Sequence, residues 1–267
     1  KNKKMVKKLF SILLLIVITF SSVKADEGMW LPQLLKSLNE SDMQECGLQL
    51  NAEDLYDVNN SSLKDAIVAL NGGMCTGEMI SSKGLMLTNH HCAFDVIQTH
   101  STISNDYLTD GFWAMTKDEE LPNEGFSVSF LVSIESVTDR VLEELGEIKD
   151  SERNMKLRTI FNTISLEKTN GTHYNARVKS FFGGNEFYLM TYITYNDVRL
   201  VGAPPSSIGK FGGDTDNWMW PRHTGDFALF RVYCSPDGKP SEYSEENIPF
   251  TPKHHLPIQL DGVDNGD

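Results

Sequence analysis

The stretch Leu85-Met86-Leu87-Thr88-Asn89-His90-His91-Cys92 decides how this chain is interpreted. It begins as an apolar strand and runs into a polar corner that ends in a histidine followed by a cysteine. A histidine at the end of a rigid strand points in a fixed direction and stays open to a substrate, which is what a general base requires. We therefore take His91 as the candidate general base.

A second cysteine lies upstream of this corner. Residues 75–81 predict a strand that turns through Ser82-Lys83-Gly84 into the strand before the histidine. A disulfide from Cys75 to Cys92 would clamp both sides of that hairpin. The order of strand, turn, strand and His-Cys is similar to the histidine corner of chymotrypsin-like serine peptidases.

Residues 1–25 have the composition of a secretory signal peptide. Five lysines precede an apolar run from Leu9 to Phe20, which is too short to span a bilayer comfortably, and a small residue, Ala25, ends the segment. We expect cleavage there, export to the periplasm, the cell surface or the medium, and no stable membrane anchor afterwards. The alternative is an uncleaved anchor.

The remaining chain is strongly acidic. The full sequence has a formal charge of -13, and the leader carries six lysines and no acidic residue, so its removal lowers the charge to -19. Nucleic-acid binding depends on basic patches, so we expect no nucleic-acid partner. Four cysteines in an exported chain suggest disulfides, and Cys46 and Cys234 could pair with each other or stay free.

The periodicity predicts helices near the start and mainly strands afterwards. Helices are expected at 31–38, at a second site capped by Ser41 with Gln44, at 62–70, at 93–98, and, as a solvated surface helix or pair, within 136–168. Alternation predicts one strand at 126–134 and three between 174 and 201. The chain is therefore expected to be mainly β with helices, which suits a barrel.

A second informative stretch runs from Gly212 to Tyr233. A glycine-rich polar loop passes two tryptophans and enters a strand just after Asp226. An aspartate there is in the place where chymotrypsin-like peptidases have the acid that orients the catalytic histidine. A turn-capping aspartate is the alternative, and Trp220 and Phe227 are expected to serve packing.

Together these stretches resemble a known family. The runs 89–92, 217–226 and 26–30 are similar to the bacterial serine dipeptidyl-peptidases typified by dipeptidyl-peptidase 7 and dipeptidyl-peptidase 11, and the resemblance extends from about Asp26 to Asp267. It implies a chymotrypsin-like double β-barrel with an inserted helical domain. It also implies removal of dipeptides from the free amino end of peptides, no cofactor, and a homodimer as the full-length protein.

The resemblance also implies roles for single residues. It makes His91 the general base and Asp226 its orienting acid, and it matches Asn217 and Trp218 to positions that hold the substrate's terminal ammonium. An amide oxygen can accept a hydrogen bond from that ammonium. An indole can supply a wall and a cation–π contact.

One part of the family's active site is missing from this sequence. The family's nucleophile is a serine in a Gly-Asn-Ser-Gly type turn, and no such turn occurs here. Ser206 and Ser207 lack the glycine that lets a chain bend closely around a nucleophile, and we reject both. We expect residues 26–267 to be the amino-terminal part of the peptidase domain. The serine, and the residues that choose between acidic and apolar side chains, are expected beyond Asp267.

Two other classes of function stay open. A metal-dependent hydrolase would use His90, His91, Cys92 and His100, but adjacent histidines rarely bind one ion through both rings, so no metal site is predicted. A relative without the nucleophile would bind peptides and be inactive. The fragment alone is expected to be inactive in any case.

Overall fold

The computed structural model describes residues 30–211, 213, 219–221, 223–262 and 264. Its helices, including short 3-10 turns marked η, are η1 (Pro32–Leu34), α2 (Leu35–Leu38), α3 (Glu40–Glu45), α4 (Ala52–Leu55), η2 (Leu63–Ala66), α5 (His90–His100), α6 (Tyr107–Asp110), η3 (Lys117–Glu119), α7 (Thr138–Leu145), α8 (Asp150–Thr169), η4 (Phe182–Gly184) and α9 (Ser206–Gly209). Among these, none has the length and apolar character needed to cross a membrane.

The strands are β1 (Ile67–Leu70), β2 (Cys75–Met79), β3 (Leu85–Thr88), β4 (Phe112–Trp113), β5 (Leu121–Pro122), β6 (Val128–Ser136), β7 (Tyr174–Phe181), β8 (Glu186–Tyr195), β9 (Val198–Ala203), β10 (Ala228–Cys234) and β11 (Ile248–Pro249). They form one sheet in the order β4-β9-β10-β3-β2-β1-β6-β8-β7, with β11 on β10 and β5 on β9. Every pairing is antiparallel. The prediction of a mainly β chain with helices is confirmed.

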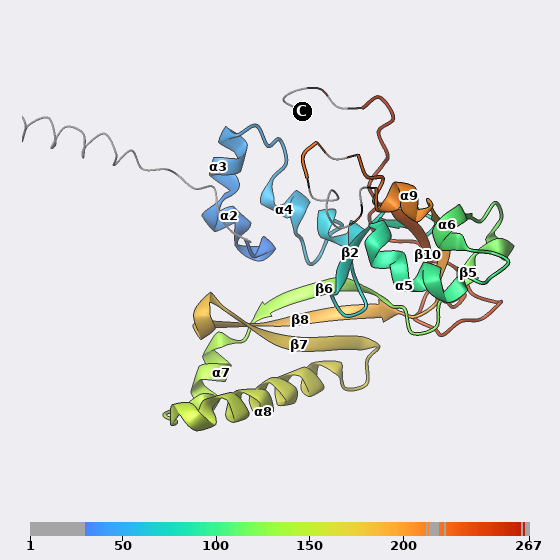
Figure 1. The fold of residues 1–267 in the computed structure, drawn as a ribbon. Helices are drawn as coiled ribbons and strands as arrows, with labels where there is room; N and C mark the ends of the chain where they lie inside the picture. The colour runs from blue at the N-terminus through green and yellow to red at the C-terminus, as the bar shows by residue number, and fades with distance from the viewer. Residues whose placement is uncertain (1–29, 212, 214–218, 222, 263, 265–267) are drawn as a thin grey trace, which may run out of the picture.

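The sheet order places strands from distant parts of the chain side by side. Strand β10 lies between β9 and β3, so a strand near residue 230 completes a sheet begun near residue 67 (Figure 1). One apolar core gathers residues from both halves, including Val68, Met86, Leu200 and Phe230, all at most 2% exposed. The stacked rings of Phe126 and Phe230, with centroids 4.8 Å apart, join the two halves within that core.

A second, smaller core lies under the helices of the middle segment. Helix α8 runs alongside the β7–β8 hairpin in Figure 1, and its residues Leu157, Ile160 and Ile164 are buried against Phe187 and Leu189 of β8. The prediction of helices at 136–168 is confirmed. The expectation of a solvated surface pair is corrected in one respect, because the apolar face of α8 is buried against this hairpin.

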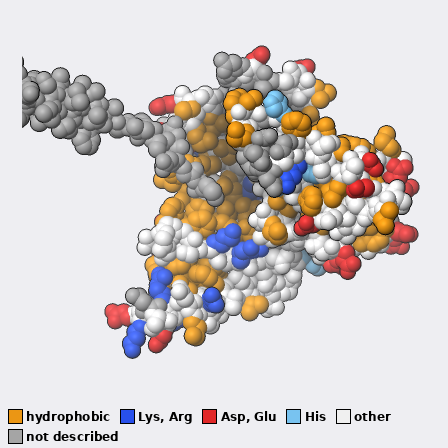
Figure 2. Space-filling view, viewed as in Figure 1, with side chains coloured by type: hydrophobic (Ala, Val, Ile, Leu, Met, Phe, Trp, Pro, Cys, Tyr) orange, Lys and Arg blue, Asp and Glu red, His pale blue; other side chains and the backbone are white. Residues whose placement is uncertain are grey.

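Figure 2 shows hydrophobic side chains gathered in a hollow above β6 and β8.

Two predictions about the first helices are wrong. Residues 62–70 do not form one helix, because η2 ends at Ala66 and β1 takes its place. Within β1, Val68 and Leu70 are buried and Ile67 and Ala69 are half-buried, which is the period-two pattern of a strand. Ser41 lies inside α3 rather than capping it.

A buried polar network fixes β10 to the rest of the sheet. Glu120 accepts hydrogen bonds from Arg231 Nε and from the hydroxyl of Tyr233, each 2.8 Å long. Burial, followed by the hydrogen bond to Glu120, raises the pKa of Tyr233 well above its usual range. The hydroxyl of Tyr233 therefore stays protonated and donates its hydrogen bond. Because Arg231 and Tyr233 both bind Glu120, the network holds β10 in register.

We predict that Leu200→Ala destabilises the fold by about 2–5 kcal/mol, because this fully buried side chain would leave a cavity in the main core. Leu260 is 91% exposed, so Leu260→Ala should change stability by less than about 0.5 kcal/mol. Urea unfolding of both variants measures the difference. Equal losses would show that the core is not organised as described.

Candidate active site

The pairing of β3 with β10 creates the site. Thr88, the last residue of β3, lies opposite Ala228, the first residue of β10. His91 follows Thr88 at the start of α5, and Asp226 comes just before Ala228, so the pairing brings both to the same end of the two strands. The prediction of a short helix after the histidine is confirmed by α5, although the helix already begins at His90.

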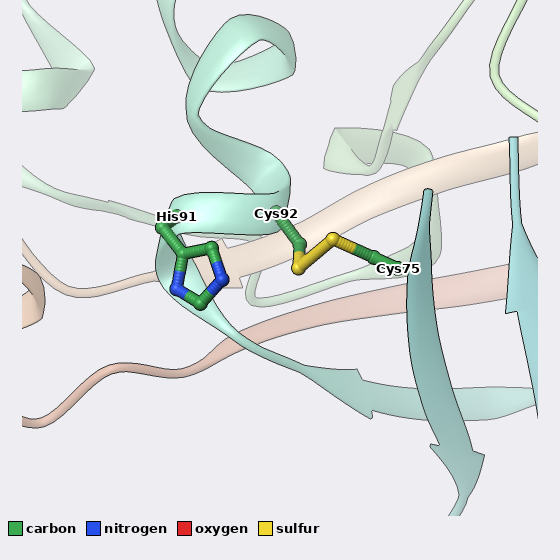
Figure 3. Close-up of side chains that lie close together, drawn as sticks. All are labelled: Cys75, His91 and Cys92. Atoms are coloured by element: carbon green, nitrogen blue, oxygen red, sulfur yellow. A yellow bond between two sulfur atoms is a disulfide. The ribbon is translucent and has the colours of Figure 1, made fainter. Parts of the chain in front are cut away.

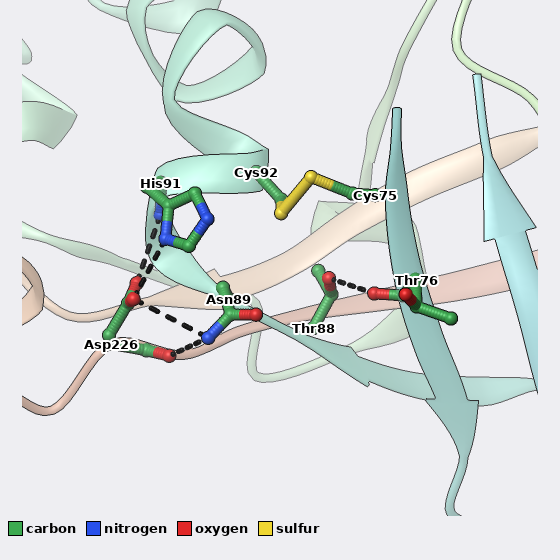
Figure 4. Close-up of a disulfide and its surroundings, with 7 residues drawn as sticks. All are labelled: Cys75, Thr76, Thr88, Asn89, His91, Cys92 and Asp226. Atoms are coloured by element: carbon green, nitrogen blue, oxygen red, sulfur yellow. Dashed lines mark hydrogen bonds and ion pairs between the residues drawn. A yellow bond between two sulfur atoms is a disulfide. The ribbon is translucent and has the colours of Figure 1, made fainter. Parts of the chain in front are cut away.

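The imidazole of His91 and the carboxyl of Asp226 are in direct contact. Nδ1 of His91 lies 2.8 Å from Oδ2 of Asp226, and the backbone N–H of His91 donates to Oδ1 at 3.1 Å (Figure 4). A carboxylate only accepts hydrogen bonds, so the contact places the ring proton on Nδ1. Neutral imidazole then has its basic lone pair on Nε2. The side chain of His91 is 50% exposed and that of Asp226 only 10%.

Asn89 holds the aspartate from a second side. Its side-chain amide donates to the backbone carbonyl of Asp226 at 3.2 Å and, more weakly, to Oδ2 at 3.4 Å. Asn89 is also the residue before the first turn of α5, but its side chain forms no capping hydrogen bond there. Sequence reasoning missed this role, because an asparagine before a helix indicates a cap rather than a partner 137 residues away.

A disulfide joins Cys75 of β2 to Cys92 of α5, directly after the histidine (Figure 3). Next to it, the hydroxyl of Thr88 donates to the backbone carbonyl of Thr76 at 2.7 Å. Two links thus connect the histidine corner to the neighbouring strand. Cys46 and Cys234 are both free, the first exposed and the second buried.

His90 is a buried neighbour of the site. It is 1% exposed, and its Nε2 has no hydrogen-bond partner among the described residues. Burial lowers the pKa of His90, against the opposing charge of Asp226 and a hydrogen bond with the Pro204 backbone. The ring fits tightly against Gly209, where an added Cβ would lie 2.3 Å from its Cγ.

Among the other residues singled out in the sequence, Ser206, Trp220 and Phe227 lie within the described part of the chain. Asn217 and Trp218 lie outside the described residues. Ser206 is in α9, and its buried hydroxyl has no hydrogen-bond partner among the described residues. Trp220, expected to pack, is 89% exposed, whereas Phe227 is half-buried with its ring 6.1 Å from that of Trp113.

A comparison with known protein families identifies the family of this chain. Residues 25–267 match the family described as Peptidase S46. The chain belongs to the peptidase S46 family. This match covers β3, β10 and all of the chain between them.

Three S46 relatives or solved structures are similar to this chain over nearly its whole length. It is 49% identical over 261 residues to an "Asp/Glu-specific dipeptidyl-peptidase" of Flavobacterium psychrophilum, covering 97% of this chain and 36% of the relative. It is also 49% identical to a "Dipeptidyl-peptidase 7" of Phocaeicola vulgatus, covering 97% and 37%. The crystal structure of Porphyromonas endodontalis DPP11 in complex with the dipeptide Arg-Asp superposes with a TM-score of 0.84, at 46% identity, covering 91% of this chain and 36% of that one. The S46 chain thus spans about a third of the length of these relatives.

We predict that His90 makes the stability of the fold depend on pH. Because its pKa is lower in the folded chain, the unfolded chain takes up a proton first as the pH falls below about 6.5. The stabilisation is therefore complete above that pH and is lost as the pH falls toward the folded pKa. His90→Phe keeps a ring against Gly209 but cannot titrate, so it should reduce the loss.

Urea unfolding at pH 7.5 and 5.5 measures this dependence. The matched control is His173→Phe, at an exposed histidine before β7, which should keep the full pH dependence. If His90→Phe and His173→Phe respond equally to pH, His90 is not the responsible group.

Proposed function

We propose that this chain provides the general base and orienting acid of an exported serine-type dipeptidyl-peptidase. The observation that carries the proposal is the 2.8 Å contact between Nδ1 of His91 and Oδ2 of Asp226. This contact is the part of a Ser-His-Asp triad that fixes the tautomer of the histidine. The names of the S46 relatives support the reaction class.

In the proposed mechanism, His91 accepts the proton of a serine that lies beyond residue 267. Its Nε2 holds the lone pair for this step because the N–H at Nδ1 donates a hydrogen bond to Asp226. Asp226 then stabilises the imidazolium while the acyl-enzyme forms, and water releases the product. Because Asp226 is itself held by Asn89 and by the backbone N–H of His91, it needs little reorganisation during the reaction.

Dipeptide release follows from anchoring the substrate's amino end at a fixed distance from the serine. We assign that anchor to Asn217 and Trp218, on the resemblance of the 217–226 block to the family. The residues that choose between acidic and apolar side chains are assigned to the part of the protein outside this chain. This assignment accounts for equal identity to an Asp/Glu-specific relative and to a dipeptidyl-peptidase 7.

The proposal extends to architecture and location. The antiparallel sheet and its main core are assigned to the amino-terminal part of a chymotrypsin-like double β-barrel, and residues 1–25 to a cleaved signal peptide. The full-length protein is proposed to act outside the cytoplasm as a homodimer on peptides with a free amino end. These assignments rest on the sequence pattern and on the family resemblance.

Replacement of the base should abolish turnover. In the protein encoded by the whole gene, His91→Ala should lower kcat/KM for dipeptidyl substrates by about 10⁴-fold or more, because the serine loses its proton acceptor. The control is His173→Ala, which removes an exposed histidine and should leave turnover unchanged. Ordinary activity of the His91→Ala enzyme would contradict the assignment.

The amino-end anchor should show itself in substrate binding. Asn217→Ala should raise KM for free-amino peptides more than it lowers kcat, because the amide binds the ammonium in the ground state as well as in the transition state. Peptides with an acetylated amino end should be poor substrates for both enzymes. If KM stays unchanged, the anchor lies elsewhere.

The reading frame after the codon of Asp267 separates this proposal from its alternative. A frame that continues to a Gly-x-Ser-Gly turn supports the peptidase. A stop codon at that point would favour the inactive, peptide-binding relative, which keeps base and acid but has no nucleophile.

A further inference from the structure

Three potential metal ligands converge beside the base. The Sγ atoms of Cys75 and Cys92 and a ring nitrogen of His91 all lie within 4.8 Å of one another. Figure 4 shows one ring nitrogen directed to Asp226 and the other on the side of the disulfide. Since Nδ1 is the nitrogen bonded to Asp226, Nε2 is the one that faces the sulfurs.

In the oxidised protein the two sulfurs are bonded to each other and offer no thiolate. We propose that reduction of the Cys75–Cys92 disulfide by a dithiol creates a zinc site formed by both thiolates and Nε2 of His91. The S–S bond takes up two electrons and two protons from the dithiol, which itself closes to a disulfide. Zinc then binds the sulfurs as thiolates and releases the two thiol protons.

The backbone around the site is held by contacts other than the disulfide. Strand β2 pairs with β1 at four positions and with β3 on its other side. Helix α5 is anchored by Ala93 and Ile97, which are both fully buried in the main core. Reduction therefore leaves the two cysteine backbones close to their present positions.

The dimensions suit one tetrahedral ion. The two cysteine Cα atoms lie 6.1 Å apart. With Zn–S bonds of about 2.3 Å, two thiolates on one tetrahedral ion are roughly 3.8 Å apart, a separation that rotation of the side chains can provide. The three ligands leave a fourth position for water. The half-exposed ring of His91 gives an ion access from solvent.

Asp226 already forms the outer contact that zinc-binding histidines use. A histidine bound to zinc through one nitrogen usually donates its other N–H to a carboxylate, which fixes the ring and raises its basicity. His91 and Asp226 have this arrangement at 2.8 Å. The geometry proposed for proton transfer therefore also suits metal binding.

This zinc site would regulate catalysis. That consequence, unlike the binding of zinc, rests on the proposed function. Zinc on Nε2 would occupy the lone pair that accepts the serine proton, so the reduced, zinc-loaded protein would be inactive. The binding itself does not depend on any peptidase activity. It can therefore be tested on the mature full-length protein without measuring turnover.

The test measures metal binding with cobalt as the spectroscopic probe. The chain carries Cys46→Ser, because Cys46 is an exposed free thiol that could bind metal on its own. A water-soluble phosphine, which is oxidised to its oxide by taking oxygen from water, reduces the disulfide without chelating the ion. We expect the reduced chain to bind one equivalent of Co²⁺ with a thiolate charge-transfer band that Zn²⁺ abolishes. The oxidised chain should bind at least about tenfold more weakly.

Three variants make the result specific. Cys75→Ser should remove most of the charge-transfer band, and His91→Ala should weaken binding at least about tenfold. His173→Ala, at an exposed histidine away from the corner, should bind as tightly as the parent. Equal binding by the His91→Ala chain, or no gain in binding on reduction, would overturn the proposal. Loss of the sheet's circular dichroism on reduction would also overturn it, because the sheet must hold the ligands in place.

Discussion

The antiparallel pairing of β10 with β3 is the contact on which the site depends. It joins segments that are about 140 residues apart and puts His91 and Asp226 at the same end of two neighbouring strands. The network of Glu120 with Arg231 and Tyr233 then holds β10 from its other end. A fixed strand pair is a better support for a 2.8 Å contact than two loops would be, because loops move more than the elements that they connect.

Exposure changes sharply within a few residues at this corner. His90 is buried and His91 is half-exposed, because successive residues at a helix start point in directions about 100° apart. The buried ring packs against α9, while the exposed one stays in contact with a nearly buried carboxylate. The same pair of adjacent histidines thus divides structural and chemical roles between them.

The sequence was most informative where a pattern is local. The run at 75–81 and the Ser82-Lys83-Gly84 turn predict the hairpin of β2 and β3, and helical spacing predicts α8. The prediction failed at 62–70, where the apolar run 67–70 fits a helix or a strand equally well. Pairing with both β2 and β6 makes these residues a strand, and no local signal reports such partners.

The candidate site also contains some residues that the sequence predicts and others that only the structure reveals. The place of His91 at the end of a strand already makes it a candidate base, and the family resemblance joins it to the distant motif that contains Asp226. The contact of Asn89 with Asp226 and the burial of His90 depend on tertiary packing. The sequence around an asparagine or a histidine does not show in which direction its side chain points. Such roles become visible only when the distances are known.

The long separation between His91 and Asp226 has a consequence for the newly made chain. The two residues are 135 positions apart, and their contact needs β10 to be inserted between β9 and β3. Loops of this length close slowly, and a chain emerging from its amino end presents the histidine long before the aspartate. The order of synthesis therefore delays the contact: His91 cannot meet Asp226 until the chain has been made beyond β10.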